Sequence, residues 1–194
     1  MRQPNRRDHC NVKAINPGKG RQMSQNRPDP VAPADAAALA QARALLAARH
    51  AALAYADPET AVPGISRIAF GRDEGGQPLT LVSALAEHAG ALRANPACAV
   101  LLGEVGAKGD PLIHPRLMLR ARAEFVAADD PARAGLRALW LKAHPKAALY
   151  LDFADFAFVR LHPAGAVLNA GFGRACRIAA ADLVQIGLST RSVT

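Results

Sequence analysis

The sequence has few cysteines and no long apolar run. Its three cysteines, Cys10, Cys98 and Cys176, are odd in number and far apart, which argues against a disulfide framework and against the short ligand spacing of a metal site. No segment reaches the ~18 to 20 consecutive apolar residues of a membrane-spanning helix, and the first residues lack the apolar stretch of a secretory signal. We therefore expect a cytoplasmic protein with no membrane segment and no metal site.

Aromatic residues are also scarce. They make up 5% of the 194 residues, whereas hydrophobic residues of all kinds make up 51%. Much of that share is alanine, which is too small to fill a core alone, so Leu, Val, Ile and Phe must supply the packing. The length suits one folded domain with tails.

Positive charge is concentrated at the start of the chain. The formal net charge is +8, and residues 1–30 hold seven Lys or Arg against two Asp. This stretch has few large apolar residues, so we predict that residues 1–32 form a disordered basic leader. It is either a solvated tail or an extension upstream of a true start at Met23. Because the charge lies mostly there, we do not expect nucleic-acid binding.

The patterns that follow predict a domain of short strands with a few helices. The alanine-rich residues 33–55 predict an opening helix, with Leu39, Leu46 and Leu53 recurring every seven residues. Two further helices are expected, over 86–95 and from Asp130-Pro131 to 143. Alternation and apolar runs predict strands over 64–70, 79–83 as its hairpin partner, 98–102, 116–125, 156–161, 166–169 and 177–184.

These elements favour a mainly β (α+β) antiparallel barrel over a doubly wound sheet, because strands and helices do not alternate regularly. We place the domain at residues 33–186 and a C-terminal tail at 187–194. Small barrels fill their own interior, so a large ligand would lie at a barrel edge or between subunits.

Several short motifs occur in a distinctive order over residues 36–184. They are Ser66-Arg67, residues 81–88 (LVSALAEH), residues 109–117 (GDPLIHPRL), His144-Pro145, Tyr150, Asp155-Phe156 and residues 171–175 (GFGRA). Together they resemble the haem-utilisation branch of the pyridoxamine 5'-phosphate oxidase-like FMN-binding split barrels. The resemblance implies an antiparallel Greek-key split β-barrel with flanking helices, which assembles as a homodimer.

The resemblance also implies one FMN per subunit at the dimer interface, and a flavin-dependent oxidoreductase whose substrate and catalytic residues are unknown. The resemblance implies that Arg67 faces the phosphate, that Ser66 and Ile68 flank the ring through their backbone, and that Arg116 lies near the flavin. Ser83 and Leu85 lie on the phosphate side, and His88 begins a short helix whose N-terminus faces the anion.

The sequence departs from the family in one segment of this site. In the family, the residue after this histidine is a threonine, and two places further along is an asparagine. In this chain His88 is followed by Ala89, Gly90 and Ala91. We therefore expect weakened FMN binding, with purified protein partly or wholly without flavin.

Two alternative functions follow from the same resemblance. One is a haem-binding or haem-utilisation protein, although haem-degrading relatives take an iron ligand from a C-terminal histidine and no histidine follows His162. The other is a degenerate, non-catalytic split barrel that acts as a binding module. These residues also have interpretations that need no ligand. Arg67 and the row of Arg116, Arg120 and Arg122 could face solvent, and turn geometry before proline explains His114 and His144.

Overall fold

A computed structural model describes residues 31–171 and 173–188 of the chain. The predicted leader lies outside it except for its last two residues, and the predicted tail lies outside it from residue 189. None of the described helices is long and apolar enough to cross a membrane. The elements, in chain order, are β1 (Ala32–Pro33), α1 (Ala36–Leu45), β2 (His50–Ala56), β3 (Pro63–Ala69), β4 (Gly71–Arg72), β5 (Pro78–Ser83), α2 (Glu87–Ala94), β6 (Ala97–Leu102), η1 (Pro111–Ile113), β7 (Arg116–Phe125), α3 (Arg133–Ala143), η2 (Pro145–Leu149), β8 (Phe156–Asn169), β9 (Ala175–Ile178) and α4 (Ala180–Leu188).

The strands form one mostly antiparallel sheet that branches at β8. Its main path runs β1-β9-β8-β7-β6-β2-β3, and β5 pairs with the first half of β8 and with β4. Because β6, β7 and β8 are sequential neighbours and β5 lies beside β8, these four strands form a Greek key. The mainly antiparallel α+β fold predicted from the sequence is confirmed.

The clearest alternation in the sequence becomes the central strand β7. Leu117, Leu119 and Ala121 are buried, whereas Arg120 and Arg122 are exposed. Its neighbour β8 is one continuous strand where two were predicted. The pairing shifts register between Arg120 and Ala121, where β8 bends through Gly165 with φ 138°, a conformation that favours glycine.

The predicted helix over 33–55 is wrong in its second half. Asp35 caps α1 by accepting the Ala38 N–H at 2.7 Å, and the helix ends at Leu45. The next regular element, β2, places alternate residues in the core, with Leu53 fully buried between β3 and β6. Alanine's helix propensity is a weak preference, and tertiary pairing overrides it.

Two other expectations need correction. The segment predicted as a strand over 177–184 is a strand only to Ile178, and then becomes α4, which buries Leu183 and Ile186. β5 pairs with the short β4 at only two positions and mainly with β8, so it is not the hairpin partner of β3. In both cases the local pattern indicates extended or apolar chain, whereas long-range pairing decides its partner.

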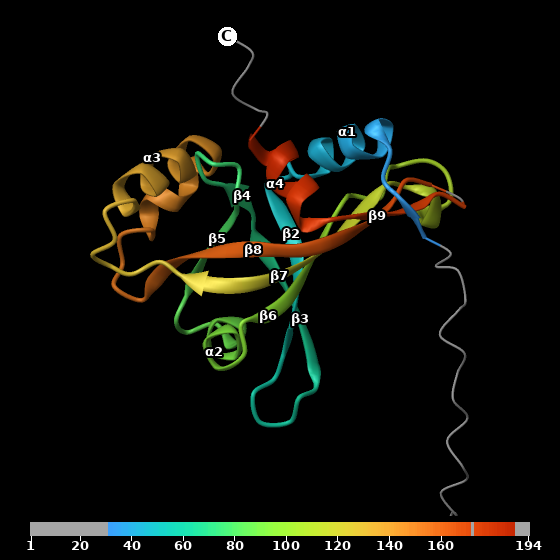
Figure 1. The fold of residues 1–194 in the computed structure, drawn as a ribbon. Coiled ribbons are helices and arrows are strands. Elements are labelled where there is room, and N and C mark those ends of the chain that lie inside the picture. The colour runs from blue at the N-terminus through green and yellow to red at the C-terminus, as the bar shows by residue number, and fades with distance from the viewer. Residues whose placement is uncertain (1–30, 172, 189–194) are drawn as a thin grey trace, which may run out of the picture. The chain divides into compact units, whose positions relative to one another are not determined.

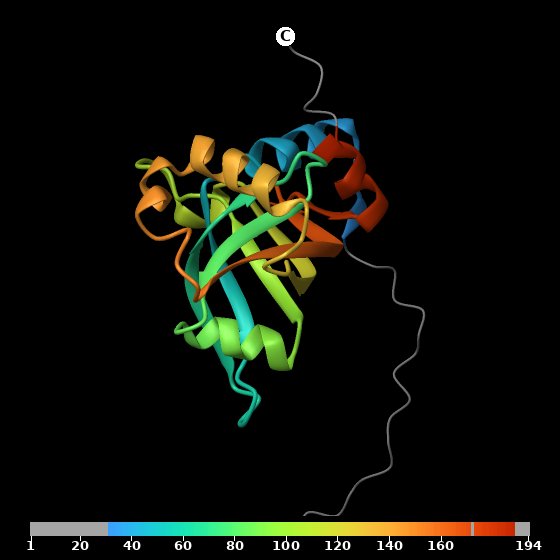
Figure 2. The same ribbon diagram turned by 90° about the vertical axis from the view of Figure 1, so that its left-hand side faces the viewer.

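Two cores stabilise the domain. The larger fills the barrel interior and includes Leu53, Phe70, Leu119 and Leu168. The smaller lies between α3 and the outer side of β5 and β8, around Trp140 and Phe158, whose rings meet edge to face at 5.8 Å. In Figures 1 and 2, α1, α3 and α4 lie toward one end of the sheet and α2 lies at the other. These helices leave the outer side of β2, β3, β6 and β7 uncovered.

Because β2 is buried, a Leu→Ala substitution there should lower the free energy of unfolding much more than the same substitution at an exposed position. Leu53→Ala should lower the free energy of unfolding by about 2 to 5 kcal/mol, because it leaves a cavity in the barrel core. Leu112→Ala, in the exposed η1 turn, should change it by less than about 0.5 kcal/mol. Urea unfolding followed by circular dichroism measures both, and equal effects would contradict the placement of β2.

Candidate functional site

The uncovered outer side of the sheet forms a continuous surface, which we call the open face. Across it, Arg67 of β3 lies opposite Ala52 of β2, which lies opposite Leu101 of β6. Leu101 lies opposite Met118 of β7, and Met118 opposite Val167 of β8. Partners in antiparallel strands point to the same side of the sheet, so these side chains share one surface.

The centre of the open face is apolar and built mostly from small side chains. Ala52, Ala54, Ala99 and Met118 are partly exposed there, and Leu101 is 43% exposed. Ile65, at the edge on β3, is 75% exposed. Such a flat apolar floor suits a planar ring system, since small residues let a ligand approach the sheet closely.

Cationic side chains border this floor on two sides. Arg67 on β3 and Arg120 on β7 are exposed, and neither makes a hydrogen bond or ion pair with another described residue. Strands β3 and β7 are separated by three strand spacings, so their backbones lie about 14 Å apart. Arg116, by contrast, donates to the backbone carbonyls of Leu112 and His114 at 2.9 and 3.5 Å, so its guanidinium braces the preceding loop.

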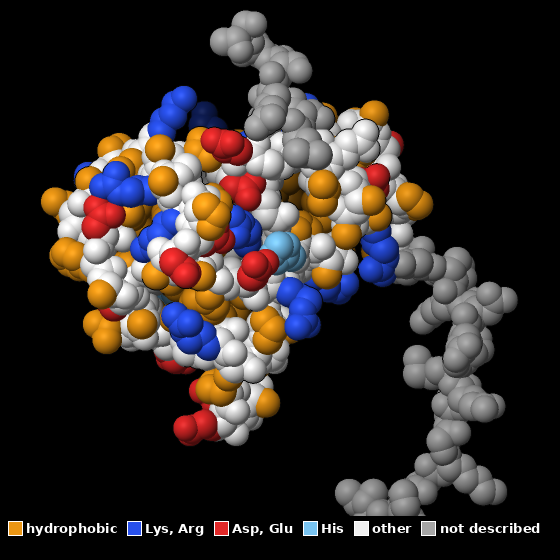
Figure 3. Space-filling view, turned by 60° about the vertical axis from the view of Figure 1, so that its left-hand side comes forward, with side chains coloured by type: hydrophobic (Ala, Val, Ile, Leu, Met, Phe, Trp, Pro, Cys, Tyr) orange, Lys and Arg blue, Asp and Glu red, His pale blue; other side chains and the backbone are white. Residues whose placement is uncertain are grey.

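Charges on the α3 side of the domain are paired instead. Arg137 donates two hydrogen bonds to Asp152, an interaction that raises the pKa of the arginine and lowers the pKa of the carboxyl. Arg160 lies 3.6 Å from both Asp73 and Asp130. Figure 3 shows this side, where basic, acidic and hydrophobic side chains are interspersed. The exposed arginines of the open face therefore differ from the paired arginines of the α3 side.

The predicted residues of β3 divide between the two sides of the sheet. Arg67 points to the open face, whereas Ile68 is buried, and Ser66 lies opposite the buried Leu53. The side chains of Ser66 and Ile68 therefore face the barrel interior, and only their backbone could meet a ligand, as the resemblance implies. No contact with a ligand tests these roles, so they stay predictions.

The predicted phosphate-side segment already has partners of its own. Ser83 donates to Asp155 at 2.5 Å and accepts the Leu85 N–H at 3.1 Å. Leu85 is 89% exposed. The Asp155 carboxylate therefore lies beside the segment where the sequence predicts a phosphate, and like charges repel.

His88 lies on α2, near the far end of β2. Its ring centroid is 6.2 Å from that of Tyr55, whose hydroxyl donates to Glu87 at 3.1 Å. Burial lowers the pKa of His88, and the adjacent Glu87 carboxylate partly opposes that shift. Glu87 also occupies the first turn of α2, which makes this helix N-terminus less favourable for an anion.

Ala89 and Ala91 are buried in the barrel core, at 0% and 1% exposure. Threonine and asparagine at these positions would point into the core rather than toward a ligand on the open face. The buried positions of Ala89 and Ala91 therefore do not explain a weakened phosphate site on the open face.

His50 is a residue of the open face that the sequence analysis missed. It begins β2 on the same side as Ala52, and it is a diagonal neighbour of Arg67 across the β2–β3 pair. Its Nδ1 lies 3.4 Å from Glu104 Oε1, and its side chain is 48% exposed. Metal-ligating histidines commonly have their second nitrogen held by a carboxylate in this way. If the alternation of Ala51, Leu53 and Tyr55 had been interpreted as a strand, His50 would have been predicted at the surface.

The other described histidines are less available. His144 Nε2 lies 3.0 Å from the Phe70 carbonyl, and burial is the main cause that lowers its pKa. His114 Nε2 is buried without a partner, beneath its own loop. His162 is exposed and paired with Glu124, away from the apolar floor. His88 faces Tyr55, as described above.

Other chemistry finds little support among residues 31–171 and 173–188. No three His, Cys, Asp or Glu side chains gather there in a way that could hold a metal ion. Burial raises the pKa of the Cys98 thiol to about 11, so this cysteine stays protonated at neutral pH. The open face is thus suited to binding a flat anionic ligand rather than to thiol or metal-cluster chemistry.

Comparison with known proteins places haem proteins among the relatives. No protein-family model matches the sequence. Over 101 residues the chain is 35% identical to the "Non-canonical heme oxygenase HOZ, chloroplastic" of Arabidopsis thaliana, a match that covers 52% of this chain and 30% of that protein. The chain therefore spans less than a third of the curated relative it matches.

Solved structures extend the match over most of the domain. One is 45% identical, with a TM-score of 0.68, and covers 78% of this chain and 98% of its own. A heme binding protein from Mycobacterium smegmatis is 27% identical, with a TM-score of 0.69, and covers 78% of this chain and 62% of that one. A putative pyridoxamine 5'-phosphate oxidase from Listeria innocua, 15% identical with a TM-score of 0.53 over 69% of this chain and 98% of that one, shows the fold alone. The split barrel predicted from the sequence is confirmed.

The burial of the α2 segment can be tested with neighbouring substitutions. Ala91→Asn should lower the free energy of unfolding by about 1 to 3 kcal/mol, because it buries an amide in the core. Gly90→Ala, whose added Cβ meets no atom within 4 Å, should raise it by about 0.5 to 1 kcal/mol through helix propensity. Thermal unfolding compares them. A stabilising Ala91→Asn would show that position 91 faces a polar site instead.

Proposed function

We propose that the chain, which has the split-barrel fold seen in a putative pyridoxamine 5'-phosphate oxidase, is a haem-binding protein that holds haem on the open face. The observation that carries this proposal is a flat apolar floor bordered by unpaired arginines, with a carboxylate-supported histidine on the same surface. The heme oxygenase and the heme binding protein among the relatives support the same class of ligand.

The floor and its border match the two chemical halves of haem. A porphyrin is a flat apolar macrocycle, and the floor around Ala52, Leu101 and Met118 can lie against its face. Haem also carries two propionates, both on one edge of the macrocycle, and the orientation of that edge decides whether they pair with Arg67 or with Arg120. Pairing would satisfy guanidinium groups that have no partner among the described residues.

His50 is the residue we assign as the axial ligand. Its Nδ1 lies 3.4 Å from Glu104 Oε1, so Glu104 is placed to accept a proton from this nitrogen, which would leave Nε2 to bind iron. Neutral imidazole is a common haem ligand. When bound, haem would supply a redox-active iron, while His50 and Glu104 fix its position and the ligand's basicity.

A second copy of the chain would cover the outer face of the haem. Strand β3 ends the main path of the sheet, and Ile65 on it is 75% exposed. A macrocycle that lies on one sheet has its other apolar face exposed to water. A second copy of the chain, packed against the same surface, would exclude that water. We therefore propose the homodimer together with the haem site.

The flavin-dependent oxidoreductase predicted from the sequence is the second candidate. Arg67 favours it, because an exposed and unpaired guanidinium on β3 can face a phosphate. The Asp155 carboxylate beside Ser83 and the acidic first turn of α2 disfavour it. Haem needs neither of these segments, so it is the better match to the charges present.

Haem titration tests the proposal directly. The wild-type protein should give a Soret band displaced from that of free haemin. His50→Ala should shift that band and weaken haem binding on the order of tenfold or more, because the iron loses its protein ligand. His162→Ala removes an equally exposed histidine that lies away from the floor, and should leave both the band and the affinity unchanged.

The same samples separate the competing functions. FMN added in place of haemin should remain in the filtrate on ultrafiltration. A tight flavin complex with no specific Soret band would reject haem in favour of FMN. Loss of the band in His162→Ala but not in His50→Ala would reject the assignment of the ligand. A folded protein that takes up neither cofactor would be the non-catalytic binding module.

A further inference from the structure

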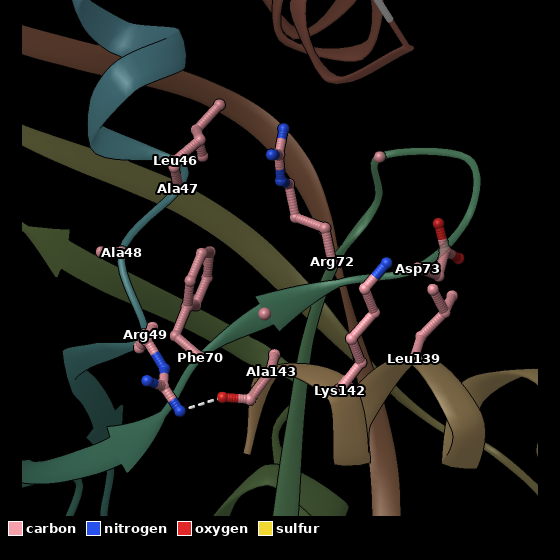
Figure 4. A pocket seen from close by; sticks show the side chains of 12 residues that line it. Leu46, Ala47, Ala48, Arg49, Phe70, Arg72, Asp73, Leu139, Lys142 and Ala143 are labelled. Carbon is pink, nitrogen blue, oxygen red and sulfur yellow. Dashed lines mark hydrogen bonds between the residues drawn. The ribbon is translucent and has the colours of Figure 1, made fainter. Parts of the chain in front are cut away.

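A second concave site lies away from the open face, and we call it the basic pocket. It is a cavity of about 360 Å³ between the end of α1, the chain leading into β2, strand β4 and the last turns of α3. Three cationic side chains line it: Arg49 before β2, Arg72 on β4 and Lys142 on α3. Figure 4 shows Arg72 and Lys142 extending to the same side, while Arg49 turns toward the Ala143 carbonyl.

The positive charge in this pocket is not balanced from within. Asp73 is the single acidic residue among those lining it, and its carboxylate is already occupied. One oxygen accepts the backbone N–H groups of Gly75 and Gln77 at 2.9 and 3.0 Å, and the other faces Arg160 at 3.6 Å. Arg49 donates only to a neutral backbone carbonyl. The pocket therefore has a net positive charge that a bound anion would neutralise.

Arg72 adds a specific indication of a ligand. Its Nη1 atom is buried and has no hydrogen-bond partner, although buried polar groups in proteins are almost always satisfied. Burial lowers the pKa of Arg72, and the charge of Arg43 on α1 lowers it further. The guanidinium still stays charged at neutral pH, so the fold holds a half-buried cation near a second one, and no ion pair joins either of them to an acid among residues 31–171 and 173–188.

The remaining walls of the pocket are apolar. Leu46 and Phe70 are buried beneath it, and Leu139 forms the α3 side. A fully hydrated ion such as sulfate would leave this surface without a partner. A ligand with one anionic end and one apolar end would use both parts of the lining.

We propose that the basic pocket binds a small phosphate monoester, with its phosphate between Arg72, Lys142 and Arg49 and its substituent on Leu46 and Leu139. A dianionic phosphate matches three cations better than a carboxylate with one charge. Its oxygens can accept the forked donors of an arginine while also meeting a lysine. This site is separate from the haem site of the open face and does not depend on it.

Isothermal titration calorimetry with phenyl phosphate tests the proposal on the full chain. Wild type should bind this probe more tightly than inorganic phosphate, which lacks the apolar group, and than benzoate, which has one charge. Arg72→Gln and Lys142→Gln should each weaken binding at least tenfold. Arg122→Gln removes an exposed arginine of β7 that is outside the pocket, and should leave binding unchanged.

Four results would overturn the proposal. Phenyl phosphate could fail to bind wild type, or it could bind Arg72→Gln and Lys142→Gln as tightly as wild type. The Arg122→Gln control could lose as much affinity as the pocket variants, or benzoate could bind as tightly as phenyl phosphate. Lys142 is exposed on α3, so its substitution should keep the fold even if Arg72→Gln does not. Haem titration of Lys142→Gln should match wild type, so failure here is distinguishable from failure of the haem proposal.

Discussion

The strand register of β2, β3, β6 and β7 is the constraint on which the proposed haem site depends. The buried row of Leu53, Val100, Leu119 and Ala166 holds the strands in one alignment, because each of these side chains fills the barrel core. The residues one place along each strand are then forced to the outer side. A slip of one residue would put Arg67 and Arg120 into the core, so burial fixes the open face as firmly as it fixes the interior.

The two proposed sites share one physical feature, which is positive charge without a nearby acid to balance it. On the α3 side the fold pairs its charges, as Arg137 does with Asp152. In the basic pocket, Arg72 has a buried guanidinium donor with no partner, whereas on the open face Arg67 and Arg120 are exposed and form no ion pair with another described residue. An anionic ligand would satisfy the buried donor of Arg72 and could pair with the exposed arginines of the open face.

Sequence reasoning recovered the strands whose pattern is unambiguous. The alternation of β7 and the apolar run of β6 were predicted with nearly the observed limits, because few other structures fit those patterns. It failed at β2, where alanine at four positions out of seven suggested a helix and concealed the alternation of Ala51, Leu53 and Tyr55. The same error hid His50, since a residue assigned to a helix over 33–55 has no reason to lie beside Arg67 of a strand. The basic pocket could not be foreseen either, because Arg49, Arg72 and Lys142 come from three separate elements that only the tertiary fold brings together.

The position of the iron tests the account most directly. Crystals of the haem-loaded protein, measured at the iron absorption edge, would give one strong anomalous peak per bound haem. The account predicts this peak at coordination distance from His50 Nε2, over the floor formed by Ala52, Leu101 and Met118, with the propionate edge toward Arg67 or Arg120. A peak at another histidine, or a haem lodged in the basic pocket, would contradict it.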